Sequence, residues 1–405
     1  MWQIGKKSKA PHQTKRNDVP ITLVKDTINE GDIHYLIEWL QTFPRLTKGK
    51  ETEKFEQKWA QWIGTEYAVF VNSGSSAVLL MLYALIETGK VSVGDKIVVP
   101  ALSWATDLSP VIQFNLHPVL CDINLQNLSV DLEHLEQIFE EEKPKALLLV
   151  SVLGLTPDMQ KIQDLCEAHN VVLLEDTCES TGSQFKNRAL GTFGAMSAFS
   201  CYFGHHFSTI EGGFINTNDR DLYNLLKMLR SHGWNRDLDM QAKAKLQAKT
   251  TDGFTDLYRF YVPGFNLRAT DLQAYLGIKQ LDRLEETVTQ RNNNYLFYKT
   301  NINNDFWNVE DGGNFISNFA FPIIHPKRDL IVKALLAANV EVRPLICGSM
   351  GTQPMYTKRF GRLELPNVSV VDKYGCYIPN HPELTEDELY KIVTIVNNVM
   401  ETPNA

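Results

Sequence analysis

The chain has 405 residues, of which 43% are hydrophobic and 22% are charged, and 40 Lys and Arg against 48 Asp and Glu give a formal net charge of −8. At roughly 100–200 residues per domain, this length predicts two or three domains with a large buried core. The composition excludes a disordered or fibrous chain, and the acidic balance argues against nucleic acid as a partner. No apolar run approaches the roughly 20 residues of a membrane-spanning helix, so we expect no membrane partner.

Residues 1–20 are polar and basic, and no apolar stretch follows their charges as a secretory signal would require. We expect a flexible tail there and a cytoplasmic protein. The six cysteines form no C-x-x-C or C-x-C pair, so the sequence indicates neither a zinc site nor an iron–sulfur cluster. We expect these thiols to be buried.

The first two thirds of the chain alternate between helical and strand-like segments. Apolar residues at helical spacing predict helices within 33–43, 51–64, 75–89 and 156–169. Short runs rich in Val, Ile, Leu or Phe predict strands within 66–73, 95–102, 117–123, 145–154, 169–177, 196–203 and 212–218. This alternation predicts an α/β fold with a mainly parallel sheet covered by helices on both faces.

The last third differs in composition. Residues 236–262 are polar and irregular, which indicates a long insertion or mobile loop that serves as a lid or a dimer arm. One long helix is expected over 270–294. Strands at 319–326 and 340–345 and helices at 330–340 and 386–400 follow. We therefore predict a large α/β domain over 21–294 and a small α+β domain over 295–405.

A turn of small residues, N-S-G-S-S-A at 72–77, follows the first strand and opens a helix. Backbone N–H groups at the positive end of a helix suit a phosphate, and Gly74 permits close approach while Ser75 adds a hydroxyl. A plain Ser/Asn helix cap is the alternative.

Asp176 stands at the carboxyl end of an interior strand, and Glu179 follows three residues later. The carboxyl ends of parallel strands form the usual ligand site of such a sheet, where an ionised Asp could pair with a protonated ring nitrogen. A capping Asp with a solvated Glu is the alternative.

Two further groups could carry chemistry. His205 and His206 lie in a turn just past a strand, where a single imidazole suits acid–base work and a packed, satisfied His is the alternative. Trp104 follows another strand, and it could stack on a flat ring or belong to the core.

The order of these motifs resembles the sugar-nucleotide aminotransferases of the DegT/StrS type, pyridoxal-phosphate (PLP) enzymes of the aspartate-aminotransferase fold (PLP fold type I). The motifs are N-S-G-S-S-A, an aromatic after V-V-P-A, E-D, G-H-H-x-S-T-x-E-G-G and G-F-N-L-R-A-T-D. The resemblance extends from about residue 30 to the C-terminus.

The resemblance implies a role for each motif. Gly74 and Ser75 would hold the cofactor phosphate together with Ser200. Trp104 would stack on the pyridine ring, which completes one side of the site.

The acidic motif and the last motif have implied roles as well. Asp176 would pair with the ring nitrogen, and Glu179 would lie near the ring hydroxyl. Asn266 would reach the phosphate from the partner subunit of a homodimer with shared active sites.

One departure from the family pattern concerns the lysine that bonds covalently to the cofactor, six residues before the Glu of E-G-G. That Glu is Glu211, and the residue six positions earlier is His205. No lysine occurs between Lys186 and Lys227, so the cofactor would be held by contacts alone, as PLP or as pyridoxamine phosphate (PMP).

A His at this place distinguishes a subgroup, the 3-dehydratases of 4-keto-6-deoxy nucleotide sugars. A related subgroup uses an iron–sulfur cluster, and the unclustered cysteines argue against it. The resemblance implies that L-glutamate converts PLP to PMP and that a nucleotide sugar, with GDP favoured, then loses its C3 hydroxyl. His205 would act as base and then acid, and the products would be a 3,6-dideoxy-4-keto sugar and ammonia.

Two alternatives stay open: a PLP-dependent aminotransferase-like enzyme acting on another substrate, and a non-catalytic relative that binds a cofactor or sugar nucleotide. His206 is interpreted as a packing residue. His232 is a weaker candidate for contacts to glutamate or the sugar. Arg343 could bind a carboxylate or diphosphate, or form a surface ion pair.

Overall fold

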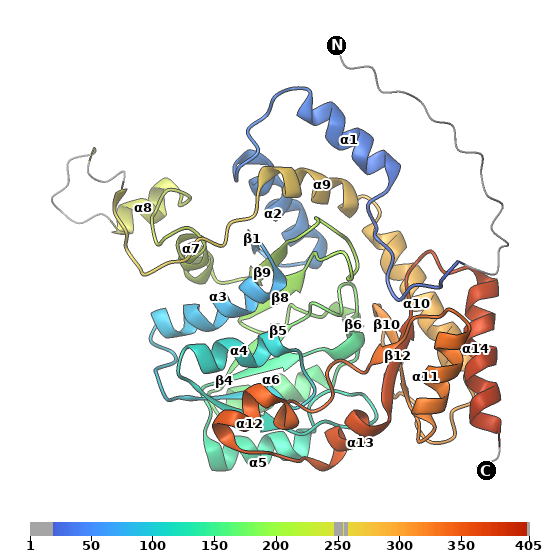
Figure 1. Ribbon diagram of the computed structural model, residues 1–405. Coiled ribbons are helices and arrows are strands. Elements are labelled where there is room, and N and C mark those ends of the chain that lie inside the picture. Colours follow the sequence, from blue (N-terminus) through green and yellow to red (C-terminus); the bar gives the residue numbers. More distant parts are fainter. Residues whose placement is uncertain (1–18, 247–253, 255–257, 403–405) are drawn as a thin grey trace.

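A seven-stranded sheet lies at the centre of the protein (Figure 1), in the order β1-β9-β8-β5-β4-β2-β3. The computed structural model describes residues 19–246, 254 and 258–402. The sheet is parallel except for β9, which runs antiparallel to β1 and β8. Its strands are β1 (Tyr67–Val71), β2 (Lys96–Pro100), β3 (His117–Cys121), β4 (Ala146–Val150), β5 (Val172–Asp176), β8 (Met196–Ser200) and β9 (Gly213–Thr217). Each predicted strand of this region is confirmed.

Helices cover both faces of this sheet. Alternate side chains of a strand enter different cores: in β4, Leu148 packs on one face and Leu147 and Leu149 pack on the other. Because both faces are buried, the strands consist almost entirely of apolar residues. One face is covered by α3 (Gly74–Glu87), α4 (Ala105–Gln113) and α7 (Arg220–Leu229), and the other by α2 (Lys50–Ile63), α5 (Leu132–Glu142), α6 (Met159–Ala168) and α9 (Asp271–Leu281).

The helix predicted over 270–294 is wrong as a single element. It is two helices, α9 and α10 (Leu284–Asn301), and Arg283 between them has φ −114° and ψ 0°. The Arg283 guanidinium binds both carboxylate oxygens of the buried Asp32, each at 2.8 Å. This long-range ion pair accompanies the break, and it joins α10 to α1 (Glu30–Leu40). Helix α10 then continues beyond residue 294.

The C-terminal part has an antiparallel sheet of its own, in the order β10-β12-β11. Its elements are β10 (Ala320–Ile324), α11 (Arg328–Ala337), β11 (Arg343–Pro344), α12 (Pro354–Phe360), α13 (Pro366–Tyr374), β12 (Gly375–Pro379) and α14 (Glu386–Glu401). Several contacts tie this part to the rest of the chain, and two of them involve the segments around β11. Ile21 pairs with Val340, and the Met350 N–H donates to the Ala101 carbonyl at 2.8 Å. The second contact brings the segment after β11 beside the end of β2.

The remaining elements are small. They are the hairpin β6 (Gln184–Phe185) and β7 (Arg188–Ala189), the 3-10 turns at Val152–Gly154 and Met350–Thr352, and α8 (Met240–Leu246). Helix α8 belongs to the predicted insertion and projects from the body of the protein (Figure 1). Residues 247–253 and 255–257 of that insertion, and residues 1–18 of the predicted tail, lie outside the described residues. Within the described ranges, no helix is both long and apolar enough to cross a membrane.

Candidate active site

The predicted site residues follow the carboxyl ends of four strands. The turn at Gly74 follows β1, Trp104 follows β2, and Asp176 ends β5. Ser200 ends β8, and His205 lies in the turn after it. Since these four strands run in the same direction, their carboxyl ends meet at one edge of the sheet. The fold therefore brings these motifs to the same edge.

The turn at the start of α3 has the form of an anion site. Ser73 caps the helix, and its Oγ accepts a hydrogen bond from the Ser76 N–H at 3.1 Å. A Cβ at Gly74 would lie 2.9 Å from Ser200 Cβ and 2.8 Å from Cys178 Sγ. Only glycine can approach the ends of β8 and β5 so closely, and the first turn of α3 points its N–H groups to this place.

Gly74→Ala is expected to weaken PLP binding about 10-fold to 100-fold, because overpacking costs about 1–3 kcal/mol. The added methyl group would push the start of α3 away from Ser200. An absorbance titration with PLP measures the effect. Gly31→Ala, in the first turn of α1, is the matched control and should bind PLP normally. Unchanged binding in a folded Gly74→Ala protein would contradict the role of this turn.

Three carboxyl groups lie together beside the end of β5. Asp176 Oδ1 accepts the Cys178 N–H at 2.8 Å. Asp107, in the first turn of α4, is fully buried and accepts the Trp104 N–H at 3.0 Å. Glu179 accepts the N–H of Leu153 at 3.0 Å. Asp107 was not among the predicted site residues, because in the sequence it is only an acid a few positions after the end of β2.

Burial decides the protonation of this cluster. Burial, and then the negative charge of Asp176, raises the pKa of Asp107 well above its usual range. Burial raises the pKa of Glu179 to about 8, and the charge of Asp176 adds to this effect. At neutral pH Glu179 therefore holds a proton. A cationic group that binds in this cluster can therefore pair with the carboxylate of Asp176.

His205 is half-buried, and a backbone hydrogen bond fixes its position in the turn. Its N–H donates to the Tyr202 carbonyl at 2.9 Å, and its ring packs edge-on against Phe319 with centroids 5.6 Å apart. Its Nδ1 is buried without a hydrogen-bond partner within the described part of the chain. Burial, and then the positive charge of Arg291, lowers the pKa of His205 to about 4. The imidazole is thus neutral at neutral pH and can accept a proton.

His206 lies in a different environment. It is fully buried, and its Nε2 is 2.9 Å from the Ser317 carbonyl oxygen. Burial, and then the charge of Arg291, lowers its pKa well below the usual value. This is the geometry of a packed, neutral histidine.

Trp104 is 54% exposed, so it does not belong to the core. It precedes α4, and its indole ring is accessible to a flat ligand. The C-terminal part approaches here as well, since Cys347 Sγ lies 2.9 Å from the Ser103 carbonyl oxygen. Tyr377 of β12 belongs to the same region: burial, and then the charge of Glu179, raises its pKa to about 12.

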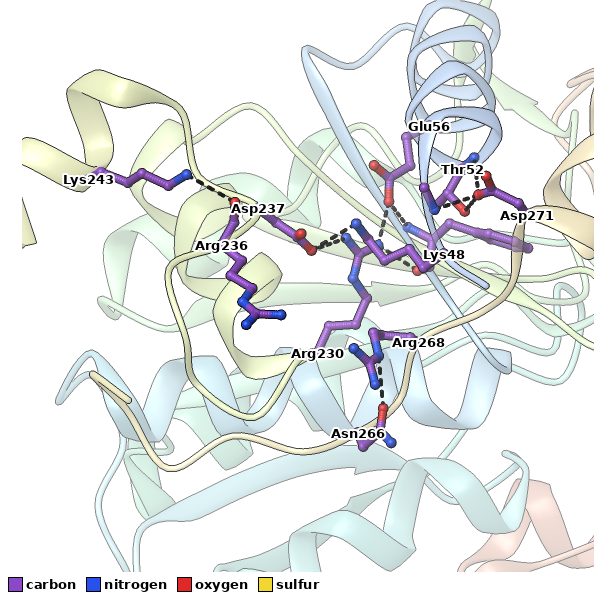
Figure 2. Close-up of polar contacts among 12 residues, drawn as sticks. Lys48, Thr52, Glu56, Arg230, Arg236, Asp237, Lys243, Asn266, Arg268 and Asp271 are labelled. Carbon is purple, nitrogen blue, oxygen red and sulfur yellow. Dashed lines mark hydrogen bonds and ion pairs between the residues drawn. The ribbon is translucent and has the colours of Figure 1, made fainter. Parts of the chain in front are cut away.

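Asn266 lies beside the Gly74 turn at the start of α3 in its own chain. The Asn72 N–H donates to the Leu267 carbonyl at 3.0 Å, and Asn266 pairs with Ser231. The Asn266 side chain is exposed and accepts a hydrogen bond from Arg268 Nε at 3.0 Å (Figure 2). This segment is therefore attached to the start of α3 through its backbone.

A buried ion-pair network supports that segment (Figure 2). Arg230 is fully buried, binds Glu56, and donates to the Phe70 carbonyl at 2.7 Å. Its second nitrogen lies 3.5 Å from Asp237, which also pairs with Lys48 at 2.8 Å. The Arg230 carbonyl accepts the backbone N–H of residue 267 at 3.0 Å. The network thus joins α2, β1 and α7 to the segment that carries Asn266.

The two weaker candidates, His232 and Arg343, have contacts of their own. His232 has φ +62°, and its ring packs edge-on against Trp234 with centroids 5.3 Å apart. Arg343 is exposed on β11, 3.9 Å from Glu341 in a loose ion pair. Its positive charge also acts on Tyr377.

The residues at this edge fit a phosphorylated pyridine cofactor. Gly74 leaves a cradle that a Cβ would fill, and the exposed Trp104 offers a stacking surface. Asp176 supplies the negative charge that a protonated ring nitrogen requires, and the Nδ1 of His205 has no hydrogen-bond partner among the described residues. Since position 205 is a histidine, the site would hold this cofactor without a covalent bond.

Comparison with known proteins finds relatives over most of the chain. GDP-4-keto-6-deoxy-D-mannose 3-dehydratase of Escherichia coli O55:H7 is 34% identical over 85% of this chain and 91% of that protein. The enzyme of the same name from Yersinia pseudotuberculosis is 32% identical over 87% of this chain and 92% of that protein.

A solved structure of the E. coli enzyme with bound hydrated PLP superimposes with a TM-score of 0.86 and 30% identity. The superposition covers 93% of this chain and 99% of that one, which confirms the predicted aspartate-aminotransferase-like fold. A family model, the DegT/DnrJ/EryC1/StrS aminotransferases, matches residues 26–397. The chain therefore belongs to the DegT/DnrJ/EryC1/StrS aminotransferase family.

Proposed function

We propose that this protein is a PLP/PMP-dependent 3-dehydratase, a lyase that removes the C3 hydroxyl of a 4-keto-6-deoxy nucleotide sugar. The observation that carries the proposal is a neutral, half-buried imidazole at position 205, where the family pattern requires a lysine. A histidine can move protons but cannot hold the cofactor covalently. The 3-dehydratase names of the relatives, at 34% and 32% identity, support the same outcome.

GDP is the favoured nucleotide. One solved structure of GDP-4-keto-6-deoxymannose-3-dehydratase, 30% identical to this chain with a TM-score of 0.86, is of a variant with bound GDP-perosamine. A relative named lipopolysaccharide biosynthesis protein, from Salmonella typhimurium, is 28% identical over 86% of this chain. Both names support a role in dideoxysugar synthesis for O-antigen.

Each site residue has one task in this proposal. The cofactor, when bound, supplies an electron sink. Gly74, Ser75 and Ser200 hold its phosphate, and Trp104 covers one face of its ring. The carboxylate of Asp176 binds the ring nitrogen.

The two remaining groups act on protons. Glu179 carries a proton at neutral pH and can donate a hydrogen bond to the ring hydroxyl. His205 takes a proton as base and returns it to the leaving C3 oxygen as acid.

The overall reaction balances with glutamate as the second substrate. Glutamate loses two electrons and its amino group and becomes 2-oxoglutarate, while the C3–OH of the sugar becomes C3–H₂. The amino group leaves as ammonia, and the C3 oxygen leaves as a water molecule that balances the water consumed in releasing the amino group. No further oxidant or reductant is required, so the proposal needs no iron–sulfur partner.

We further propose a cytoplasmic homodimer. All six cysteines are free thiols, as expected in a reducing compartment. The apolar side chains of Ile33, Ile37 and Phe43 are exposed near the N-terminus, and a second copy could cover them. Asn266 is exposed beside the Gly74 turn, and in such a dimer it would contact the cofactor phosphate in the partner's site. We keep residues 21–294 as the large domain and 295–405 as the small one.

The decisive experiment is an absorbance spectrum of the purified protein with PLP, before and after L-glutamate. The proposal expects growth of the PMP band and release of 2-oxoglutarate. A GDP-linked 4-keto-6-deoxy sugar should then release ammonia, and a CDP-linked sugar is the comparison. An amino-sugar product without ammonia would indicate the aminotransferase alternative. Failure to bind PLP would contradict the enzyme and favour a binding protein.

A further inference from the structure

Arg291 of α10 is a fully buried cation that contacts the backbone of His205. Its Nη2 donates to the His205 carbonyl at 2.9 Å. Its Nη1 donates to the Asn380 carbonyl at 2.5 Å and to the Phe319 carbonyl at 3.3 Å. Every acceptor of Arg291 within the described residues is thus a backbone carbonyl, without a carboxylate to balance its charge.

A buried charge without a counter-ion is costly in a folded protein. Burial lowers the pKa of Arg291 to about 9, so the guanidinium is still protonated at neutral pH. An apolar side chain would fill the same space without this cost. The positive charge of Arg291 disfavours a second positive charge nearby, and the imidazole of His205 is one of the groups that it affects.

The contacts of Arg291 clamp the turn that carries His205. One guanidinium joins this turn to the segment before β10 and to the residue after β12. Asn380 Nδ2 donates back to the Arg291 carbonyl at 3.1 Å, and His206 holds the same turn through the Ser317 carbonyl. The imidazole at position 205 thus projects from a backbone that three separate elements hold.

The two other histidines close to Arg291, His206 and His381, are neutral at neutral pH. Burial lowers the pKa of His206 well below the usual value and that of His381 to about 4, with Arg291 as the next cause for both. The charges of Lys25, Glu383 and Glu388 also act on His381. Within the described ranges, Arg291 is the charged group that acts on His205.

We propose that Arg291 is a positioning residue that fixes the His205 turn and, together with burial, keeps the imidazole in its unprotonated, proton-accepting form. The guanidinium does this through its contact with the His205 carbonyl and through its uncompensated charge. The inference rests on the proposed role of His205 as the base. It adds a residue that lies 86 positions away in sequence and outside every motif of the site.

The test follows the protonation of His205 directly. Protein with histidine labelled at Cε1 with ¹³C is titrated by NMR, and His205→Asn identifies the signal among the 10 histidines. The wild-type signal should stay that of a neutral ring down to about pH 5. Arg291→Gln keeps a donor for the carbonyls but removes the charge, and it should raise the titration midpoint by about one pH unit or more. Arg291→Lys keeps the charge and should stay close to the wild type.

Activity gives the second readout. In Arg291→Gln the acid limb of the ammonia-release rate should move to higher pH together with the NMR midpoint, while Arg291→Lys should keep the wild-type limb. Arg283→Gln, which removes a different arginine near the start of α10, is the matched control and should leave the His205 titration unchanged.

Two results would overturn the inference. One is a folded Arg291→Gln protein in which His205 titrates as in the wild type. The other needs no variant: His205 of the wild type titrating near 6.5, which decides the matter even if the variants fail to fold. Wild-type protein that shows the low midpoint but releases no ammonia would instead contradict the proposed function.

Discussion

His205→Asn is expected to lower the rate of ammonia release about 10²-fold to 10⁴-fold, the usual contribution of a positioned acid–base group. The Asn amide has a similar size but cannot take up a proton. PLP binding should persist, because the residues assigned to the cofactor are unchanged. Rates with GDP-sugar and glutamate, together with a PLP titration, measure both effects.

His205→Lys tests whether the dehydratase reaction depends on a histidine at this position. A lysine at this position restores the family pattern, so C3 deoxygenation should be lost and a 4-amino sugar could form instead. Mass spectrometry of the nucleotide-sugar product distinguishes the two outcomes. Full dehydratase activity in His205→Lys would show that the proton moves through another group.

The pH dependence of the wild type follows from the lowered pKa of His205, about 4. Since the base must be unprotonated, the contribution of His205 to the rate should be complete at neutral pH. It should fall about tenfold per pH unit once the pH is below the pKa of about 4. A rate that instead falls through pH 6.5 would show an ordinary imidazole in place of the desolvated one.

Asp176→Asn is expected to lower the dehydratase rate about 10²-fold to 10³-fold, as the loss of one preorganised electrostatic group does in other active sites. The amide oxygen can still accept the Cys178 N–H, so the end of β5 should keep its shape. The negative charge opposite the ring nitrogen is lost. The absorption maximum of the bound cofactor should shift as the ring loses its proton.

Stability distinguishes this electrostatic role from a structural one. Asp176 lies beside two other buried acids, and its charge raises the pKa of both. The Asn side chain removes the charge that disfavours ionisation of these acids and keeps an oxygen for the Cys178 N–H, so Tm should stay about constant. Asp164→Asn, an exposed acid on α6, is the matched control for activity and for Tm. A large fall in Tm with Asp176→Asn would indicate a structural residue.

The local sequence pattern was sufficient to predict the strands of the large sheet and most of the site residues. The strands from 66 to 218 could be predicted because a sheet buried on both faces requires nearly continuous apolar segments. The motif residues that end these strands could be predicted to meet, since parallel strands share one carboxyl edge. The histidine at position 205 was also readable, because its distance from Glu211 is a property of the sequence alone.

Long-range contacts decided the rest. The break between α9 and α10 accompanies an ion pair between Arg283 and Asp32, 251 positions apart. Asp107 is an ordinary first-turn acid in the sequence, and it becomes a buried acid only when α4 packs beside Asp176. Arg291 reaches His205 across 86 positions. Burial and charge at such distances depend on the whole packed chain, so periodicity and spacing cannot report them.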